Sequence, residues 1–406
     1  MNKAPALQGL PEDGLAGTLV GRAWVPGPVP GPSVIVLRPD GVYDLSAHFA
    51  TMSDLLDAPD PVAKVRAAVG RRVSSIEQLM PNEAAQSDDP QALRLLAPCD
   101  LQVIKAAGVT FAASLIERVI EEQARGDAAQ AAAVRWQVME LLGGDLGAIR
   151  PGSAQAMQLK ALLIDKGLWS QYLEVGIGPD AEVFTKAPVL ASVGSGAQVG
   201  IHPGSAWNNP EPEIVLAVNS RGDTVGASLG NDVNLRDFEG RSALLLGKAK
   251  DNNASCAIGP FIRLFDASYC MDDVRHCTVS LQVDGLDGFR LQGSSSMAQI
   301  SRDPFDLVAQ TLGAHHQYPD GVMLFLGTMF APTQDRGQPG SGFTHRLGDV
   351  VRISSPQLGL LVNEVSHCDR AAPWTFGLRA FYANLSARGL LMQAAAASTM
   401  VNGAMG

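Results

Sequence analysis

The sequence predicts a β-rich protein of the α+β class, and three observations support this fold class. From about residue 170 onward, short Val, Ile and Leu runs alternate with Gly, Pro, Asn and Asp turns, which is typical of strands joined by short loops. Residues 111–165 instead carry apolar positions at helical spacing. The chain has 406 residues, 46% hydrophobic and 18% charged, so its composition is that of a globular protein of two or three domains.

Changes in composition divide the chain into three parts. A polar, linker-like stretch at residues 81–90 ends a smaller N-terminal α/β module. The last residues are rich in Ala, Ser and Met, which predicts a flexible tail. We therefore expect a module over residues 1–95, a main domain over residues 96–390 and a tail over residues 391–406.

Two patterns describe the N-terminal module. Ser33–Leu37 and Val42–Leu45 flank the sequence Pro39-Asp40-Gly41, which indicates a hairpin closed by a tight turn. Leu55–Val69 has apolar residues at helical spacing, which predicts a helix. The module therefore contains both kinds of element.

The main domain is expected to begin with helices and to continue mostly with strands. Two helices are predicted between residues 111 and 146, and Ser153 could cap a third. One further helix interrupts the strands, with Ser301 or Asp303 as its cap and Pro304 in its first turn. The expected strands are Ile214–Val218, Thr278–Val283, Val322–Leu326, Val350–Ile353 and Leu358–Val362.

Charge and hydropathy exclude several classes of partner. Lys and Arg number 31 against 41 Asp and Glu, which gives a net charge of −10 without any basic run. We therefore expect no nucleic-acid partner and no membrane partner, and no apolar stretch approaches the roughly 20 residues needed to span a bilayer. Met1–Leu10 lacks the apolar core of a signal peptide, and the five cysteines lack CxxC spacing. These features favour a cytoplasmic location.

The most specific polar pattern is Asn208-Asn209-Pro210-Glu211-Pro212-Glu213, directly before the strand Ile214–Val218. Proline is tolerated at the start of a strand. Residues i and i+2 of a strand face the same side, so Glu211 and Glu213 should point together. Two carboxylates held that close repel each other unless a cation or a shared proton compensates them.

A third carboxylate, Asp232, follows 19 residues after Glu213. A turn near Asn219–Asp223 would return a paired strand towards the two glutamates. Three oxygen ligands without a nearby His or Cys suit a hard divalent ion such as Mg²⁺, with Mn²⁺ or Ca²⁺ as alternatives. The competing interpretation places the Glu-x-Glu pair on the solvent face of a strand. The polar segment Asn231–Gly240 next to it favours the metal site.

A cationic residue also follows the candidate metal ligands. The sequence Lys248-Ala249-Lys250-Asp251-Asn252-Asn253 comes shortly after the polar segment and before Gly259-Pro260. A substrate bound at the metal would need a cationic contact, and Lys250 is the candidate. The competing interpretation is that these polar residues form an ordinary solvated loop.

Four of these motifs together resemble the fumarylacetoacetate hydrolase family, in that family's order. They are the E-x-E pair, the N-D-V-x-x-R-D segment Asn231–Asp237, Lys250 nine residues before Gly259, and Gly327-Thr328 after an apolar strand. The resemblance covers about residues 100 to 385. It implies a mixed β-sandwich roll, Mg²⁺ held by Glu211, Glu213 and Asp232, and the family's active-site lysine at Lys250.

One departure separates this chain from the hydrolytic members of that family. Those members carry a G-x-N-Y-x-x-H-x-x-E segment whose His–Glu pair activates water, and the matching stretch here is Gly108–Glu117. Ser114 stands at the histidine position, and a serine cannot act as the imidazole base. This stretch, with Glu182–Lys186 and Trp207–Glu211, is similar to the sugar-acid dehydratase branch.

The dehydratase resemblance implies a reaction and a set of roles. The reaction is the metal-dependent dehydration of a 2-keto-3-deoxy-D-pentonate, derived from D-xylonate or D-arabinonate, to 2-ketoglutarate semialdehyde through a Mg²⁺-stabilised enolate. Glu117 and Glu182 would transfer protons, and a helical lid over residues 111–165 would exclude water. The implied substrate contacts are Ser114, Arg236 and Thr328.

Other interpretations remain open from the sequence alone. A C–C bond hydrolase or a decarboxylase of a related 2-keto or diketo acid shares the same metal-binding residues and differs in its chemistry. A non-catalytic metal-binding or sugar-acid-binding protein would keep the E-x-E pair but has no need of Lys250, Glu117 and Glu182 together. The family resemblance further implies a homodimer or a dimer-based homotetramer.

Overall fold

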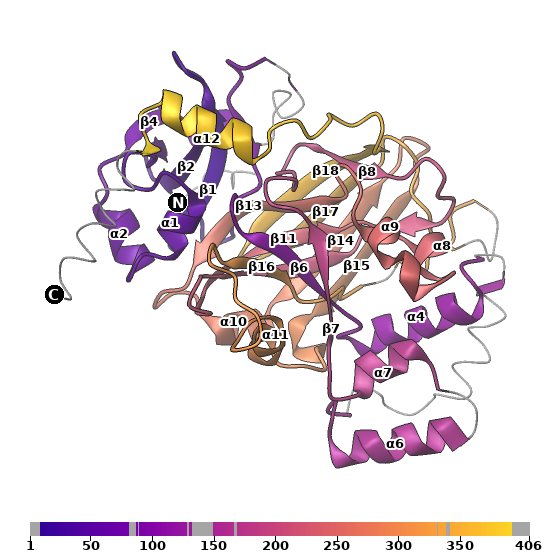
Figure 1. Cartoon of the computed structure of the whole chain (residues 1–406). Helices are drawn as coiled ribbons and strands as arrows, with labels where there is room; N and C mark the ends of the chain where they lie inside the picture. The colour runs from indigo at the N-terminus through magenta and orange to yellow at the C-terminus, as the bar shows by residue number, and fades with distance from the viewer. Residues whose placement is uncertain are drawn as a thin grey trace, which may run out of the picture.

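The computed structural model contains one long central sheet, with the other elements arranged around it (Figure 1). The described residues are 9–80, 87, 89–127, 130–131, 149–165, 169–330, 332–337 and 342–391. The expected flexible tail is almost wholly outside these residues, as are most of the expected linker and the second of the two helices predicted between residues 111 and 146.

The central sheet has eleven strands in the described part of the chain, in the order β4-β3-β2-β1-β13-β11-β10-β16-β6-β7, with β5 paired to β1. Neighbours are antiparallel except β16 and β6, which run parallel. The strands are β1 (Leu19–Val25), β2 (Gly31–Arg38), β3 (Gly41–Asp44), β4 (Arg71–Ser74), β5 (Arg94–Leu96), β6 (Val103–Gly108), β7 (Glu182–Ala187), β10 (Pro212–Val218), β11 (Thr224–Asp232), β13 (Cys256–Leu264) and β16 (Val322–Phe325).

A second sheet packs on one face of the first and makes the sandwich that the sequence predicts. Its order is β15-β14-β17-β18-β8, formed by Arg290–Ser296, Thr278–Asp284, Val350–Ser355, Gly359–His367 and Gln198–Ile201. Every second residue of β14 is buried, as expected for a strand with one face in a core. Ile214 and Leu229 of the central sheet share this core with Leu281 and Ile353 of the second sheet. The predicted β-rich fold class is thus confirmed.

The N-terminal residues extend the central sheet, because β1 pairs with β13. The predicted hairpin is present as β2 and β3, but the expected helix over Leu55–Val69 is wrong. Two short helices, α1 (Met52–Leu56) and α2 (Pro61–Ala67), replace it. Pro61 cannot continue a helix from the preceding turn, and the Asp60 side chain caps the new one. The domain boundary at residue 95 stays a prediction.

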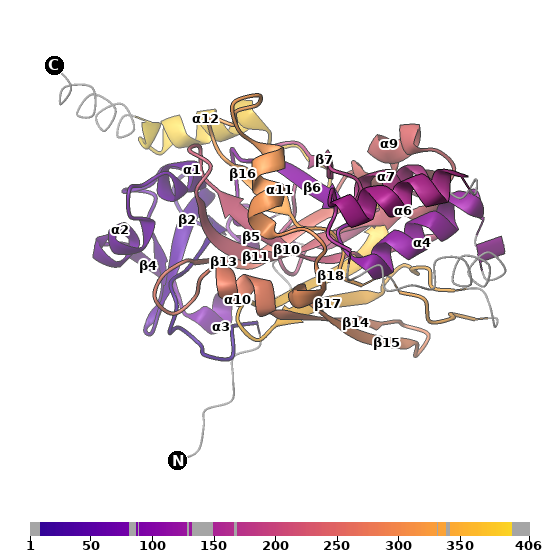
Figure 2. The same cartoon turned by 90° about the horizontal axis from the view of Figure 1, so that it is seen from below.

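Three helices gather at the other end of the sheet from the N-terminal strands, as Figures 1 and 2 show. They are α4 (Ala112–Gln123), α6 (Ala154–Asp165) and α7 (Gln171–Ile177). Val119, Ile120, Leu163 and Leu173 form part of their shared apolar core. Ser153 accepts a hydrogen bond from the backbone N–H of Ala156 at 3.2 Å, which confirms the expected cap.

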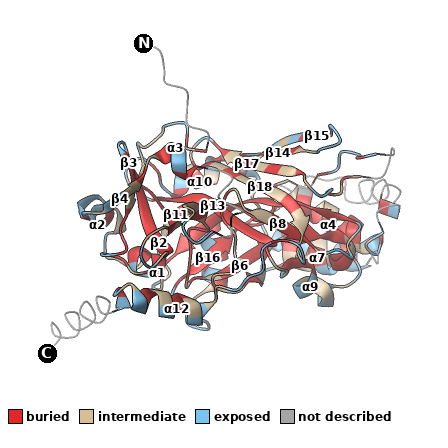
Figure 3. Cartoon of the chain, turned by 90° about the horizontal axis from the view of Figure 1, so that it is seen from above, coloured by how far each residue is buried: buried red, intermediate tan, exposed pale blue. Residues whose placement is uncertain are grey.

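The remaining elements are short. They are α3 (Ile76–Leu79), β9 (Asn208–Asn209), β12 (Asn234–Leu235), α8 (Arg236–Glu239), η3 (Ala243–Leu245), α9 (Leu246–Lys250), α10 (Met271–His276), η4 (Met297–Gln299), α11 (Pro304–Thr311) and α12 (Leu378–Ala387). Asp303 caps α11 and Pro304 begins it, as predicted. Buried residues are concentrated in the strands (Figure 3). None of the helices in the described ranges has both the length and the apolar character that a membrane crossing requires.

Candidate metal centre and active site

Three carboxylates converge at one end of the β10–β11 hairpin. The turn at Asn219–Asp223 pairs the strands so that Glu213 faces Gly230, and the backbone N–H of Asp232 donates to the carbonyl of Glu211 at 3.0 Å. One oxygen from each of Glu211, Glu213 and Asp232 lies within 4.8 Å of the other two. All three residues are buried, with at most 2% of their surface exposed. The structure therefore brings together the residues that the strand periodicity and the hairpin predict.

Gly327 fixes the position of one of these carboxylates. Its backbone N–H donates to Oε2 of Glu213 at 2.7 Å. Its φ of +98° lies in the region that side chains disfavour, and a Cβ there would approach Oγ1 of Thr110 to 2.0 Å. A larger residue at this position would displace the chain that holds Glu213.

Two lysines face the carboxylates. Nζ of Lys250 lies 2.5 Å from Oε2 of Glu211 and 2.9 Å from Oδ2 of Asp232. Nζ of Lys186 lies 2.7 Å from the other oxygen of Asp232 and also donates to the backbone carbonyls of Val233 and Lys250. Both lysines are buried. They hold the carboxyl group of Asp232 between two positive charges.

The two lysines lower the pKa of Asp232 but do not offset the raised pKa of Glu213. Burial alone would raise the pKa of Asp232, but Lys186 and Lys250 hold that pKa below its ordinary value. Burial raises the pKa of Glu213 well above its ordinary value, and the negative charges of Asp232 and Glu211 raise it further. Negative charge at Glu213 is therefore poorly compensated by the protein's own cations.

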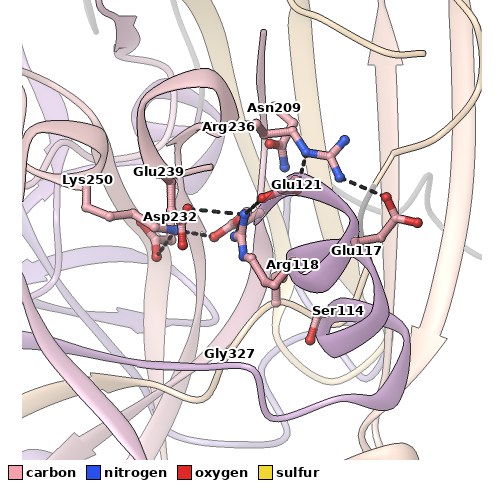
Figure 4. Close-up of polar contacts among 12 residues, drawn as sticks. Ser114, Glu117, Arg118, Glu121, Asn209, Asp232, Arg236, Glu239, Lys250 and Gly327 are labelled. Atoms are coloured by element: carbon pink, nitrogen blue, oxygen red, sulfur yellow. Dashed lines mark hydrogen bonds and ion pairs between the residues drawn. The ribbon is translucent and has the colours of Figure 1, made fainter. Parts of the chain in front are cut away.

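A chain of buried ion pairs links helix α4 to the carboxylates (Figure 4). Arg118 contacts Glu211, and its Nη1 lies 2.6 Å from Glu121 and 3.1 Å from Glu239. Oε1 of Glu121 also accepts a hydrogen bond from Nε of Arg236 at 2.6 Å. The guanidinium carbon of Arg236 lies 4.7 Å from the ring centre of Trp207. Arg236, a predicted substrate contact, is thus engaged on two sides by the protein itself.

Glu117 and Glu182, the predicted proton-transfer residues, lie in different surroundings. Glu117 pairs with Nη2 of Arg236 at 3.1 Å, and its side chain is 13% exposed. Glu182 begins β7 opposite Gly108, where a Cβ would come within 1.9 Å of its Oε2. Burial raises the pKa of Glu182, and the positive charges of Arg118 and Lys250 only partly offset this effect.

The two predicted hydroxyl contacts donate to the backbone. Oγ of Ser114 donates to the carbonyl of Phe111, the N-cap residue of α4, at 2.9 Å. Figure 4 shows this oxygen directed away from Asp232 and Lys250. Oγ1 of Thr328 donates to the carbonyl of Phe330 at 3.1 Å. Each hydroxyl still has an acceptor lone pair, so a donor on a ligand could bind it.

Sequence reasoning missed four charged residues of this cluster: Arg118, Glu121, Lys186 and Glu239. One signal was available, because Arg118 and Glu121 are three residues apart in a helix and lie among the buried residues Leu115 and Val119. Charged residues on the apolar side of a helix must find partners inside the protein. Glu239 belongs to the polar segment that follows Asp232.

The charges of the cluster fit a divalent cation. Among the described residues, seven carboxylates face four cationic side chains, so full ionisation leaves three unbalanced negative charges. The oxygens that converge belong to carboxylates alone, which are the donors that Mg²⁺ prefers. Glu211, Glu213 and Asp232 together could therefore hold such an ion.

Two curated proteins are similar to this chain in sequence. It is 25% identical over 330 residues to a "Probable 2-keto-3-deoxyxylonate dehydratase" of Haloferax volcanii, covering 81% of this chain and 93% of that protein. It is 29% identical over 187 residues to a "2-dehydro-3-deoxy-D-arabinonate dehydratase" of Saccharolobus solfataricus, covering 45% of this chain and 58% of that protein.

Solved structures share the fold. A "2-keto-3-deoxy-D-arabinonate dehydratase apo form" superposes with a TM-score of 0.56 at 18% identity, covering 86% of this chain and 99% of the other. A second structure is described as that dehydratase "complexed with magnesium and 2,5-dioxopentanoate". It gives a TM-score of 0.55 at 19% identity, over 86% of this chain and 99% of the other.

Residues 172–366 match the family described as "Fumarylacetoacetate (FAA) hydrolase C-terminal". Glu182, Arg236, Lys250, Thr328 and the three clustered carboxylates lie inside this range, whereas Ser114 and Glu117 precede it. The family match, the two relatives and the fold agree with one another, and residues 172–366 are identified as a fumarylacetoacetate hydrolase C-terminal domain.

Proposed function

We propose that this protein is a hydro-lyase that removes one water molecule from a 2-keto-3-deoxy-D-pentonate and yields 2-ketoglutarate semialdehyde. The observation that carries the proposal is the buried group of Glu211, Glu213 and Asp232 with Lys250 against it and Glu182 beside it. The names of the two curated relatives support the substrate class. The compound 2,5-dioxopentanoate, named with one similar structure, is the proposed product under its systematic name.

The three carboxylates would hold Mg²⁺, with Mn²⁺ or Ca²⁺ as alternatives. A bound divalent ion would act as a Lewis acid on the substrate's 2-keto group and make the C3 protons more acidic. Lys250 brings a buried positive charge to the same place, between Glu211 and Asp232. This charge would stabilise the negative charge that develops when a C3 proton leaves.

Glu182 is the proposed base at C3. Burial raises its pKa, and a carboxylate with a raised pKa is a stronger base. Glu117 is the second proton-transfer candidate, and its carboxylate is already engaged in an ion pair with Arg236. Ser114, Arg236 and Thr328 remain proposed substrate contacts, and α4 is proposed to act as a lid that keeps water from the site.

The test is an assay of the purified protein with 2-keto-3-deoxy-D-xylonate and with 2-keto-3-deoxy-D-arabinonate, with Mg²⁺ and after EDTA. We expect metal-dependent formation of the semialdehyde without pyruvate. A matched pair of variants sharpens the assay: Glu211→Gln should abolish turnover, while Glu364→Gln, in β18 beside Gln198, should not. Pyruvate as the product would instead indicate C–C cleavage and contradict the dehydration.

We also propose a cytoplasmic location and a homodimer or dimer-based homotetramer. The five free cysteines support the location, and the family resemblance supports the assembly. Light scattering on the purified protein would measure the assembly directly. A monomer at working concentration would contradict it.

A further inference from the structure

We propose that Glu239 is the general acid of the dehydration, the group that gives its proton to the departing C4 hydroxyl. This inference rests on the proposed function and adds a residue to it. An elimination needs a base for the C3 proton and an acid for the leaving group. Glu182 meets the first need, and the structure offers a better candidate than Glu117 for the second.

Glu239 lies inside the site without belonging to the metal-binding group. It is the last residue of α8, only seven residues after Asp232, and its side chain is 4% exposed. Its Oε2 lies 3.1 Å from Nη1 of Arg118. Within the described part of the chain, this oxygen receives no hydrogen bond of good geometry. A buried carboxyl oxygen without a hydrogen-bond partner is costly unless it serves a ligand or carries a proton.

A purely structural role explains Glu239 poorly. Arg118 is already paired with Glu121 and Glu211, so its single positive charge needs no third carboxylate. A glutamine would fill the same space next to Arg118 without adding a buried negative charge. The carboxyl group at this position is therefore more than a packing element.

The surroundings of Glu239 suit an acid that works near neutral pH. Burial raises the pKa of Glu239 to about 7, opposed by Arg118 and Lys250 and reinforced by Glu121 and Glu211. Tyr172 of α7 also faces this group. A general acid is most effective when its pKa lies near the working pH. Glu117, in contrast, is partly exposed and paired with Arg236.

The proton balance of the step is complete. The C3–H bond breaks and its proton passes to Glu182, while its electron pair forms the new C3–C4 double bond. The C4–O bond breaks and its own electron pair leaves with the oxygen, which takes the proton of Glu239 and departs as water. Arg118, 3.1 Å away, then stabilises the carboxylate that Glu239 becomes. Solvent then takes the proton from Glu182 and gives one back to Glu239, so both residues are restored and no oxidant or reductant is needed.

The test compares the variants Glu239→Gln and Glu239→Asp with Glu174→Gln. Glu174 is a control carboxylate in α7 that pairs with Lys160, outside the site. We expect Glu239→Gln to lower kcat by roughly 100-fold to 10,000-fold, the usual contribution of general acid–base catalysis, with little change in KM. Glu239→Asp should recover part of the rate, and Glu174→Gln should match the wild type.

Two further measurements separate catalysis from structure. The wild-type kcat should decline as pH rises through about 7, because Glu239 must be protonated, and this decline should vanish in Glu239→Gln. Calorimetric titration of Mg²⁺ at pH 6 should give similar affinities for both proteins, since Glu239 is then mostly uncharged. If Glu239→Gln does not fold, Glu239→Asp decides, because a shifted decline in its pH profile supports the role and an unchanged profile overturns it.

The outcomes distinguish the two proposals. The role of Glu239 would be overturned, and the proposed function kept, if the wild-type protein dehydrates a pentonate and Glu239→Gln does so at the full rate. An unchanged pH profile in that variant would have the same meaning. A wild-type protein that binds Mg²⁺ but dehydrates neither pentonate would overturn the proposed function and the role of Glu239 with it. The inference is supported if Glu239→Gln has a much lower kcat that no longer declines as pH rises through about 7, and still binds Mg²⁺ with the wild-type affinity.

Discussion

Two clusters of ionic side chains in the described part of the chain differ in their charge balance. At the second sheet, Arg336 contacts both oxygens of Asp349 at 2.6 and 2.8 Å and reaches Asp287 at 2.9 Å. Arg346 also pairs with Asp287 at 2.7 Å, so two positive charges balance two negative ones. Burial lowers the pKa of the neighbouring His345, which leaves that ring neutral at pH 7.

The cluster at the hairpin end of the central sheet is unbalanced instead. Its carboxylates outnumber its cationic groups by three in the described part of the chain. Burying an uncompensated charge is costly, so natural proteins keep one mainly where a ligand or a reaction uses it. Charge balance therefore distinguishes the ion pairs that hold this fold from those around the candidate site.

The largest effect is expected when the balanced cluster is broken. Arg336→Met would leave Asp349, which is fully buried, without its main partner. Removing one partner of a buried pair costs about 3–5 kcal/mol, so we expect the free energy of unfolding to fall by that amount. Urea unfolding would measure it. A loss below about 1 kcal/mol would mean that this cluster is not structural.

Removing a carboxylate from the unbalanced cluster should lower the turnover rate and leave the free energy of unfolding unchanged or higher. Glu213→Gln removes a carboxylate whose pKa is raised by burial and by Asp232 and Glu211. We expect turnover to fall by more than about 100-fold, because even outer partners of a metal ligand usually contribute 10–100-fold. The metal-free protein should unfold at the same temperature or a higher one. A lower unfolding temperature without a loss of turnover would reverse the comparison.

The same contrast applies to metal binding. Mg²⁺ at 100 times its dissociation constant should stabilise the wild-type protein by about 2.7 kcal/mol, because only the folded state holds the three carboxylates together. Glu213→Gln should lose this stabilisation. Arg336→Met should keep it, despite its lower starting stability. Thermal unfolding with Mg²⁺ and with EDTA would measure all three proteins, and equal stabilisation of both variants would exclude the triad as the binding site.

The two clusters should also respond to pH in opposite directions. The pKa of Glu239 is raised from 4.5 to about 7, so its contribution to stability is present below pH 4.5 and lost as pH rises through about 7. Burial would raise the pKa of Asp349, but hydrogen bonds from His345 and Arg336 hold it at about 2. Its contribution is present above pH 3.8 and lost as pH falls through about 2.

The measurement for this contrast is the unfolding temperature of the metal-free protein between pH 8 and pH 5. It should rise as the pH falls, and the rise should be smaller in Glu239→Gln. If the variant and the wild type show the same pH dependence, Glu239 does not titrate in this range.

The convergence of the three carboxylates was predictable from the sequence, and the ion pairs around them were not. Glu211 and Glu213 are two residues apart in a strand, and Asp232 returns through one hairpin, so local periodicity places all three. Arg118 and Glu211 are 93 residues apart, and Arg236 and Glu121 are 115 apart. No local pattern specifies which face of α4 meets α8.

The fold shows the same division. Strands and caps followed from alternation and from the Asp303-Pro304 signal. Pairing of β1 with β13 joins segments more than 200 residues apart, and nothing in either strand alone identifies its partner. The Leu55–Val69 prediction failed because apolar spacing continued across Pro61, although proline begins a helix more readily than it continues one. Local signals thus placed individual elements, although not always their bounds, whereas the partners of β1 and β13 depend on distant contacts.

The smallest effect is expected at a surface ion pair. It tests whether the burial of an ion pair affects the free energy of unfolding as much as its charge balance does. Arg275 pairs with Asp303 at 2.8 Å and with Asp272 at 2.7 Å, but Asp303 and Asp272 are 47% and 77% exposed. Water solvates these carboxylates when the guanidinium is removed, so Arg275→Met should cost only about 0–1 kcal/mol. The substitution matches Arg336→Met, and the same urea experiment applies. A cost near that of Arg336→Met would show that charge pairing alone, and not desolvation, determines how much an ion pair contributes to this fold.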